Sequence, residues 1–222
     1  DALLRIPKEM DSVTAAGFTM TYGTSMYGLK QRGCLKSGEK LLVLGAGGGV
    51  GITAVEIGKI MGAEVIAAAS SENKLAAAKR AGADHLINYS EGNIREKIKN
   101  IVGSSGIDVL YDPVGGELFE PCLRSLAWGG RALVIGFASG TIPKLPTNLT
   151  LVKGCSVVGV FWGAFRIKET EEDNKNFEIL FKWFKEKKVS PLVSQKFSLE
   201  NAKEALLTLA TRKAIGKVII TP

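Results

Sequence analysis

The stretch Lys40-Leu-Leu-Val-Leu-Gly-Ala-Gly-Gly-Gly-Val-Gly-Ile-Thr-Ala-Val-Glu-Ile-Gly-Lys-Ile-Met61 decides the fold of this chain. Residues Lys40–Leu44 form a short, mostly apolar run, which is typical of a parallel strand buried on both faces. Four residues after the glycines recur at helical spacing and form one apolar face: Val50, Ala54, Ile57 and Met61. A strand, a glycine loop and a helix are therefore expected in direct succession.

The same rhythm continues toward the C-terminus. Apolar runs predict five further strands, at Glu64–Ala69, His85–Asn88, Ile107–Tyr111, Arg131–Gly136 and Ser156–Val160. Helices are expected between them, at Ser71–Arg80, Asn93–Val102 and Glu117–Leu126. Six strands alternating with helices predict the α/β class, as a doubly wound parallel six-stranded sheet of the Rossmann type with strand order 3-2-1-4-5-6.

The two flanks of this pattern are less regular. Ala2–Arg5 resembles the end of an earlier strand, and two helices are expected next, at Met10–Ala16, where Gly17 breaks it, and at Thr24–Gln31, where Gly33 ends it. The C-terminal part predicts an amphipathic helix at Asn176–Lys187, then a strand, a helix at Leu199–Thr211 and a last strand at Lys217–Thr221. This last part has the pattern of a piece of another structural unit.

The glycine loop is typical of a dinucleotide-binding site. Gly45 begins the turn after the first strand, Gly48 leaves room for a pyrophosphate, and Gly51 lets helix and sheet touch. Free N–H groups at the start of the helix, at Gly49 and Val50, would then face the phosphates. The alternative is that the glycines form only a tight turn, but the position of the loop between a strand and a helix favours a binding site.

The end of the second strand indicates which dinucleotide is bound. NAD sites usually place an acidic residue there to hold the ribose 2′-hydroxyl. This chain has Ser70, Ser71 and, one helical turn later, Lys74, which suit a 2′-phosphate and predict NADP(H). Ser71 also fits a role as helix cap. Glu72 would repel a phosphate if it pointed inward, but at a helix N-terminus we expect it to point outward.

Composition and motifs exclude several other classes. One histidine, His85, and three scattered cysteines (Cys34, Cys122, Cys155) give no metal site, and a structural role is expected for His85. No apolar run approaches the ~20 residues of a membrane span. The Tyr-x-x-x-Lys motif of short-chain dehydrogenases and the acidic residues of methyltransferases are missing. The net charge of +7 is interpreted as solvated lysines, so a nucleic-acid partner is not expected.

Six stretches together resemble the zinc-independent, zeta-crystallin-like quinone oxidoreductases of the medium-chain dehydrogenase/reductase superfamily. They are residues 17–29, 42–51, 67–74, 81–89, 111–116 and 216–218. The resemblance covers nearly the whole chain. One mild departure is Gly45, where the family often has alanine.

The resemblance implies a division of the chain and a set of binding residues. Residues 1–22 would be a hinge and remnant of a GroES-like catalytic domain, residues 23–165 the NADP-binding Rossmann domain, and residues 166–222 a C-terminal segment that returns to the truncated catalytic domain. Thr24 would meet the nicotinamide amide, Gly48–Gly51 the pyrophosphate, and Ser71, Lys74 and Tyr89 the 2′-phosphate. The nicotinamide ribose and ring would be lined or covered by Val114, Gly115, Gly136, Phe137, Phe161, Trp162 and Gly163.

The implied activity is reduction of a small quinone-like substrate by NADPH, without a metal. No catalytic acid or base in this chain is singled out, and the chain alone is expected to be inactive. A homodimer is expected through the apolar sixth strand. The expected location is cytoplasmic, with the mitochondrion as the alternative. The rival hypothesis is a non-enzymatic NADPH-binding protein with a regulatory, structural or nucleic-acid-binding role.

Overall fold

The computed structural model describes residues 3–222, and its central feature is a six-stranded parallel sheet with order β3-β2-β1-β4-β5-β6. The strands are β1 Lys40–Leu44, β2 Glu64–Ala69, β3 His85–Asn88, β4 Ile107–Asp112, β5 Leu126–Val134 and β6 Ser156–Gly159. The helices around them are α2 Gly49–Ile60, α3 Glu72–Arg80, α4 Ile94–Val102, α5 Phe119–Leu123, preceded by the 3-10 turn Gly116–Leu118, and α6 Thr147–Lys153. The predicted doubly wound Rossmann arrangement is confirmed.

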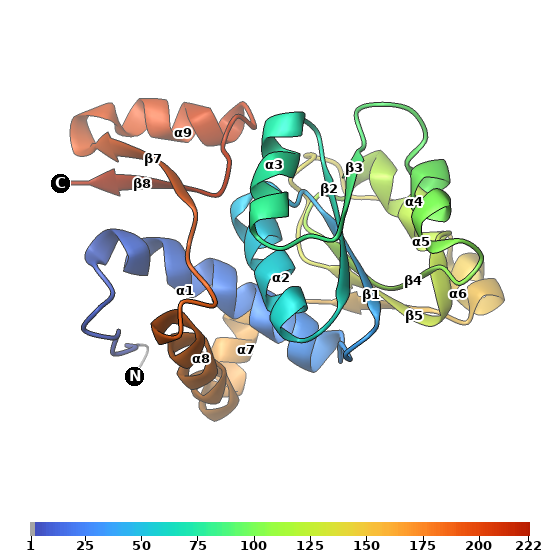
Figure 1. Ribbon diagram of the computed structural model, residues 1–222, viewed down its shortest axis with the longest axis horizontal. Helices are drawn as coiled ribbons and strands as arrows, with labels where there is room; N and C mark the ends of the chain where they lie inside the picture. Colours follow the sequence, from blue (N-terminus) through green and yellow to red (C-terminus); the bar gives the residue numbers. More distant parts are fainter. Residues whose placement is uncertain (1–2) are drawn as a thin grey trace.

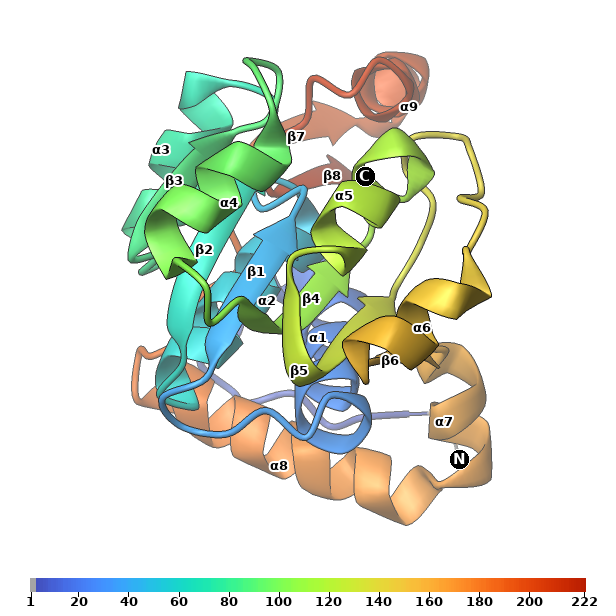
Figure 2. The same ribbon diagram turned by 90° about the vertical axis from the view of Figure 1, so that its right-hand side faces the viewer.

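Alternate residues of the central strands point to opposite faces of the sheet. On β1, Leu41 and Val43 belong to one apolar cluster, together with residues of α2 and of the helical segments 12–26 and 170–185, whereas Leu42 and Leu44 belong to another, together with residues of α4 and α5. All four side chains are fully buried, which explains the continuous apolar run in the sequence. Figures 1 and 2 show the helices on both sides of the sheet.

The N-terminal helix differs from the prediction. One helix, α1 (Ser12–Met26), replaces the two that were expected, and a π-helical segment, Tyr27–Arg32, ends it at Gly33. Gly17 lies inside α1 and does not break it, and a Cβ atom there would meet Pro191 at 3.4 Å, an ordinary contact distance. Leu3–Arg5 has no strand partner, so the strand expected at Ala2–Arg5 is wrong for the residues that are described.

The region after β4 also differs. Strand β5 begins at Leu126, inside the helix expected at Glu117–Leu126, and its pairing with β4 skips residues between Leu126 and Arg131. Gly129 has a φ of 73°, so the irregularity forms where a glycine allows it. Two short helices, α6 and α7 (Trp162–Lys168), were not predicted, since neither is long enough to show a clear period.

The C-terminal part forms a small unit beside the Rossmann core. Helix α8 (Thr170–Lys185) packs on α1, and β7 (Val193–Ser198) pairs with β8 (Lys217–Thr221), with α9 (Ala202–Ala210) packed on the pair. Figure 1 shows β7, β8 and α9 set apart from the main sheet. The loop between α9 and β8 returns to the core, where the Gly216 N–H donates to the Gly47 carbonyl at 2.8 Å.

A buried tyrosine–carboxylate pair joins α1, α2 and this C-terminal part. The Tyr22 hydroxyl donates to Glu56 Oε2 at 2.5 Å, and Tyr22 is fully buried. Burial raises the pKa of the Glu56 carboxyl to about 7, although hydrogen bonds from Tyr22 and the Ser190 backbone favour its charged form. The protonated carboxyl is therefore the form that this site favours up to neutral pH.

Replacing Glu56 by glutamine should change how stability depends on pH. Because the folded pKa lies above the unfolded value of 4.5, native Glu56 is stabilising below pH 4.5 and its contribution is lost as pH rises to about 7. Relative to Glu56→Gln, the native chain should lose about 3 kcal/mol of unfolding free energy across that window. Urea unfolding at several pH values measures this, with the exposed Glu178→Gln as control; a constant difference between Glu56→Gln and the native chain would contradict it.

Candidate nucleotide-binding site

A cleft lies at the carboxyl ends of the central strands, where the order of strands reverses between β1 and β4. It has a volume of about 780 Å³ and is lined by the glycine loop, the ends of β2, β3 and β4, and the loop that follows α9. In doubly wound sheets this switch point is where ligands bind. Among the residues predicted for a site, nine line the cleft: Gly45, Gly48, Gly49, Val50, Ser70, Lys74, Tyr89, Val114 and Gly115.

Gly48 and Gly51 play different parts in the glycine loop. A Cβ on Gly48 would meet only the Gly45 carbonyl oxygen, at 3.4 Å, and its φ of −84° is allowed for any residue, so the open space there belongs to the cleft. A Cβ on Gly51 would collide with the backbone of Gly45 and Ala46. Gly48 is thus dispensable for the protein's own packing, whereas Gly51 is required for it.

The start of α2 offers hydrogen-bond donors to the cleft. The Ile52 N–H is the first to bond within the helix, to the Gly48 carbonyl at 2.9 Å. The preceding N–H groups of Gly49, Val50 and Gly51 belong to the first turn, which has no acceptor inside the helix. Together with the positive end of the helix dipole, they form a site suited to an anion.

A cationic corner closes the other end of the cleft. Lys74 Nζ donates to Ser70 Oγ at 3.3 Å and to the Arg212 carbonyl at 2.8 Å. Burial lowers the pKa of Lys74, and the positive charge of Arg212 lowers it further. The Lys74 ammonium therefore lies near a second cation. Burial raises the pKa of Tyr89, whose hydroxyl also bonds with Ser70. A dianion placed here would relieve the repulsion between the two cations.

Arg212 was missed by the sequence analysis. It lines the cleft from the loop after α9, and its guanidinium donates to the Ser139 carbonyl at 2.7 Å. The loop therefore bridges the cleft, from Lys74 on one side to Ser139 on the other. Arg212 lies 138 residues after Lys74, and the only nearby signal was the Gly216–Val218 stretch of the family resemblance.

The wall formed by β4 depends on a buried carboxylate. Asp112 Oδ1 accepts hydrogen bonds from the N–H groups of Val114 (2.7 Å) and Gly115 (2.8 Å), while burial raises its pKa. Gly115 has a φ of 66°, which disfavours any side chain at this turn. The turn directs Val114 and Gly115 into the cleft.

The remaining predicted residues do not line the cleft: Thr24, Gly51, Ser71, Gly136, Phe137, Phe161, Trp162 and Gly163. Ser71 is the N-cap residue of α3, but its side chain makes no capping hydrogen bond. Trp162 packs against Gly23 of α1 and donates through Nε1 to the buried Asp173 at 2.8 Å, so it is held in a helix interface. Phe161 is 75% exposed.

Two polar residues singled out in the sequence lie outside the cleft. Glu72 is exposed, accepts from Asn88 Nδ2 at 3.1 Å and does not line the cleft. His85 begins β3, and its Nε2 lies 2.9 Å from the Glu64 carboxylate, at the amino end of the sheet and opposite the cleft.

Residues 3–222 offer neither a metal site nor a membrane span of the kinds described next. They contain no group of three or more His, Cys, Asp or Glu side chains that could hold a metal ion. No helix in that part of the chain is long and apolar enough to cross a membrane.

Comparison with known proteins gives consistent matches. Residues 49–181 match the family model of the zinc-binding dehydrogenases. Quinone oxidoreductase-like protein 2 from Bos taurus is 37% identical over 220 residues, which cover 99% of this chain and 63% of the bovine protein. The chain thus spans less than two thirds of that relative's length.

Two solved structures are similar in fold along the whole chain. Escherichia coli quinone oxidoreductase complexed with NADPH superposes with a TM-score of 0.90 at 28% identity, covering 99% of this chain and 68% of that one. A mycobacterial protein complexed with NADPH superposes with a TM-score of 0.92 at 28% identity, covering 98% and 67%.

Proposed function

Because this chain belongs to the zinc-binding dehydrogenase family of the medium-chain dehydrogenase/reductase superfamily, we propose that it is the NADPH-binding part of an oxidoreductase that reduces quinones or similar activated carbonyl compounds. The observation that carries the proposal is a single cleft with an anion-binding helix start in its middle and a cationic corner at one end. Two similar structures were solved with NADPH, which supports the choice of ligand.

The residues of the cleft fit a dinucleotide of this kind. The N–H groups at Gly49, Val50 and Gly51 would hold the pyrophosphate above Gly48, where the structure leaves room for it. Ser70, Ser71, Lys74 and Tyr89, joined by Arg212, would surround the 2′-phosphate. Gly45, Val114 and Gly115 would border the nicotinamide half, with Gly136 and Phe137 beyond them.

When bound, the nicotinamide supplies the hydride that is transferred. The chain's own residues would bind, orient and shield it. Thr24 would form a hydrogen bond with the carboxamide, and Phe161 and Gly163 would border the ring or the substrate. Trp162 would act through packing, because its contacts with Gly23 and Asp173 hold α1, and with it Thr24, in place.

The division of the chain follows from the same proposal. Residues 23–165 would form the NADP-binding domain, while residues 1–22 and 166–222 would connect to a catalytic domain like that of the longer relatives. Four leucines of the small unit are more than half exposed, which suits a surface that packs on another domain: Leu199, Leu206, Leu207 and Leu209.

Turnover by this chain tests the proposal. We expect NADPH binding by calorimetry but NADPH oxidation with a simple para-quinone at least about 100-fold slower than that of the full-length E. coli enzyme, because one wall of the substrate site would be missing. Comparable rates would show that the active site is complete within these 222 residues. No measurable NADPH binding would contradict the proposal itself.

We also propose that the chain forms a homodimer through β6. This strand is an edge of the sheet, and Val157 and Val158 on it and Phe161 after it are partly or largely exposed. Exposed edges pair readily with another strand. Light scattering should give twice the chain mass, and Val158→Lys should shift it to the monomer; a monomer at high concentration for the native chain would refute the proposal.

A further inference from the structure

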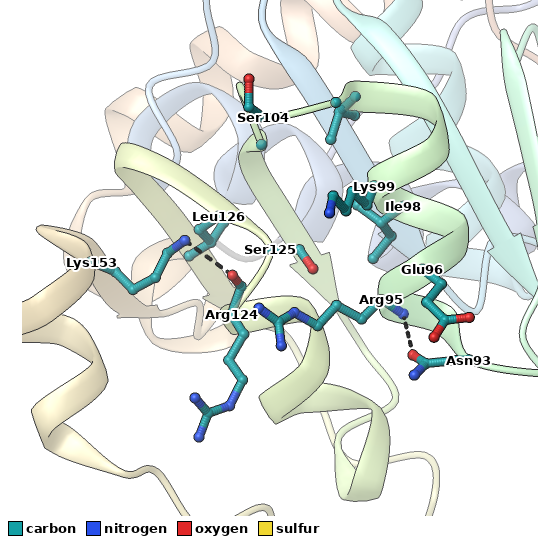
Figure 3. A pocket seen from close by; sticks show the side chains of 13 residues that line it. Asn93, Arg95, Glu96, Ile98, Lys99, Ser104, Arg124, Ser125, Leu126 and Lys153 are labelled. Carbon is teal, nitrogen blue, oxygen red and sulfur yellow. Dashed lines mark hydrogen bonds between the residues drawn. The ribbon is translucent and has the colours of Figure 1, made fainter.

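A second hollow lies on the sheet face that α4, α5 and α6 cover. It has a volume of about 410 Å³. Residues of α4 and the turn after it form one wall, residues 124–126 between α5 and β5 form the other, and Lys153 stands at the end of α6 (Figure 3). Its lining shares no residue with the nucleotide cleft.

Basic side chains gather around this pocket. Its lining includes Arg95, Lys99, Arg124 and Lys153, against one acidic side chain, Glu96. Arg95 and Lys99 are four residues apart on α4 and so share a face. Figure 3 shows Arg95 extending from α4 toward residues 124–126, with Lys99 closer to α4, while Lys153 comes from the opposite side, where its Nζ donates to the Arg124 carbonyl at 3.0 Å.

Three of these four cations take part in no ion pair among the described residues. The Arg124 guanidinium pairs with Glu120 at 2.6 Å. Within residues 3–222, Arg95, Lys99 and Lys153 take part in no ion pair. These three cations, two from α4 and one from α6, lie around one hollow, where charge-assisted hydrogen bonds would favour an anion.

We propose that this pocket binds a small organic phosphate, with the phosphate group held by Arg95, Lys99 and Lys153. The Ser104 hydroxyl adds a donor in the α4 wall, whereas the Ser125 hydroxyl in the other wall already donates to the Pro121 carbonyl at 2.9 Å. The volume lies within the range of small-molecule sites, about 300–1,000 Å³, and exceeds what one phosphate ion needs. Three apolar side chains, Ile98, Val102 and Leu126, are also among the lining residues.

Chemical-shift mapping on the ¹⁵N-labelled 222-residue chain tests the proposal. Glucose 6-phosphate is the probe, with inorganic phosphate and glucose as comparisons. We expect saturable shifts confined to the amides of residues 93–104, 124–126 and 153, with a Kd at or below about 1 mM. Glucose should cause none, inorganic phosphate should bind more weakly, and the amides of Gly48 and Gly49 should not move.

A matched pair of double variants decides whether the pocket's cations are responsible. Arg95→Ala with Lys99→Ala should weaken binding at least about tenfold, since each removes a charge-assisted hydrogen bond from an exposed side chain that the fold does not need. The control, Arg80→Ala with Lys203→Ala, removes the same charges elsewhere and should leave binding unchanged. Shifts spread over all basic surfaces, equal effects of the two double variants, no saturation, or equal binding of inorganic phosphate would overturn the proposal.

Discussion

Gly48→Val is expected to weaken NADPH binding by more than about 100-fold while the fold persists. A valine at this position would fill the space in front of the first turn of α2, where the pyrophosphate is proposed to sit, because the Cβ meets no protein atom closer than 3.4 Å. Losing two charge-assisted hydrogen bonds from backbone N–H groups would cost about 3–6 kcal/mol. Calorimetric titration with NADPH measures the loss.

The fold should tolerate this change. Gly48 has extended backbone angles (φ −84°, ψ 172°), which valine adopts readily, and it is the N-cap of α2 without a side-chain capping bond to lose. We expect the unfolding free energy to change by about 1 kcal/mol or less. Unchanged NADPH affinity in a folded Gly48→Val chain would show that the cofactor binds elsewhere.

Gly51→Ala is the matched control within the same loop. A Cβ there collides with the Gly45 carbonyl, so the strand and the helix must move apart. Such overpacking costs about 1–3 kcal/mol, which thermal unfolding detects directly. The two variants thus distinguish a glycine that leaves room for the ligand from one that the protein's own packing requires. Gly48→Val should lose NADPH binding and keep its stability, whereas Gly51→Ala should lose stability.

The sequence predicted the sheet well because each central strand carries its own signal. Lys40–Leu44 and Glu64–Ala69 are buried on both faces, so nearly every residue is apolar and the run is visible without knowledge of its neighbours. Gly17 was misinterpreted for the opposite reason. Helix α1 is held by partners distant in sequence, such as Phe181 against Phe18 and Glu56 against Tyr22, and a local rule can only treat a glycine within it as a helix breaker.

Within the candidate site, residues close to a strand end were predicted, and residues brought in from distant segments were not. The glycine loop and Lys74 lie next to strand ends, so the strand–loop–helix pattern located them. Arg212 reaches the cleft only because the loop after α9 folds back onto Gly47, and no periodicity near Arg212 encodes that return. Trp162 was expected near the ring, yet its indole is anchored to Asp173, a partner on α8 that the motif could not reveal.

Lys74→Met and Arg212→Gln should each reduce the preference for NADPH over NADH by about 10- to 100-fold, and together by more. Each removes one cation from the corner that is proposed to hold the 2′-phosphate, and a hydrogen bond to a charged group contributes about 1.5–3 kcal/mol. Methionine is chosen because the Lys74 stem packs against Gly47, where a Cβ would lie 2.5 Å from Lys74 Cβ, so the unbranched stem must be kept. Glutamine leaves a donor for the Ser139 carbonyl and so keeps the loop after α9 closed.

The distinction between the two cofactors makes this prediction specific. NADH lacks the 2′-phosphate, so its affinity should stay within about twofold in both variants, whereas a general disturbance of the cleft would weaken both cofactors alike. Lys79→Met, on the same helix but outside the cleft, should change neither affinity. Competition titrations of NADPH and NADH on the native chain, the two single variants, the double variant and Lys79→Met provide the comparison. If NADH already binds the native chain as tightly as NADPH, the cationic corner does not recognise a phosphate. If Arg212→Gln leaves the preference for NADPH intact while Lys74→Met abolishes it, the loop after α9 closes the cleft without contacting the 2′-phosphate.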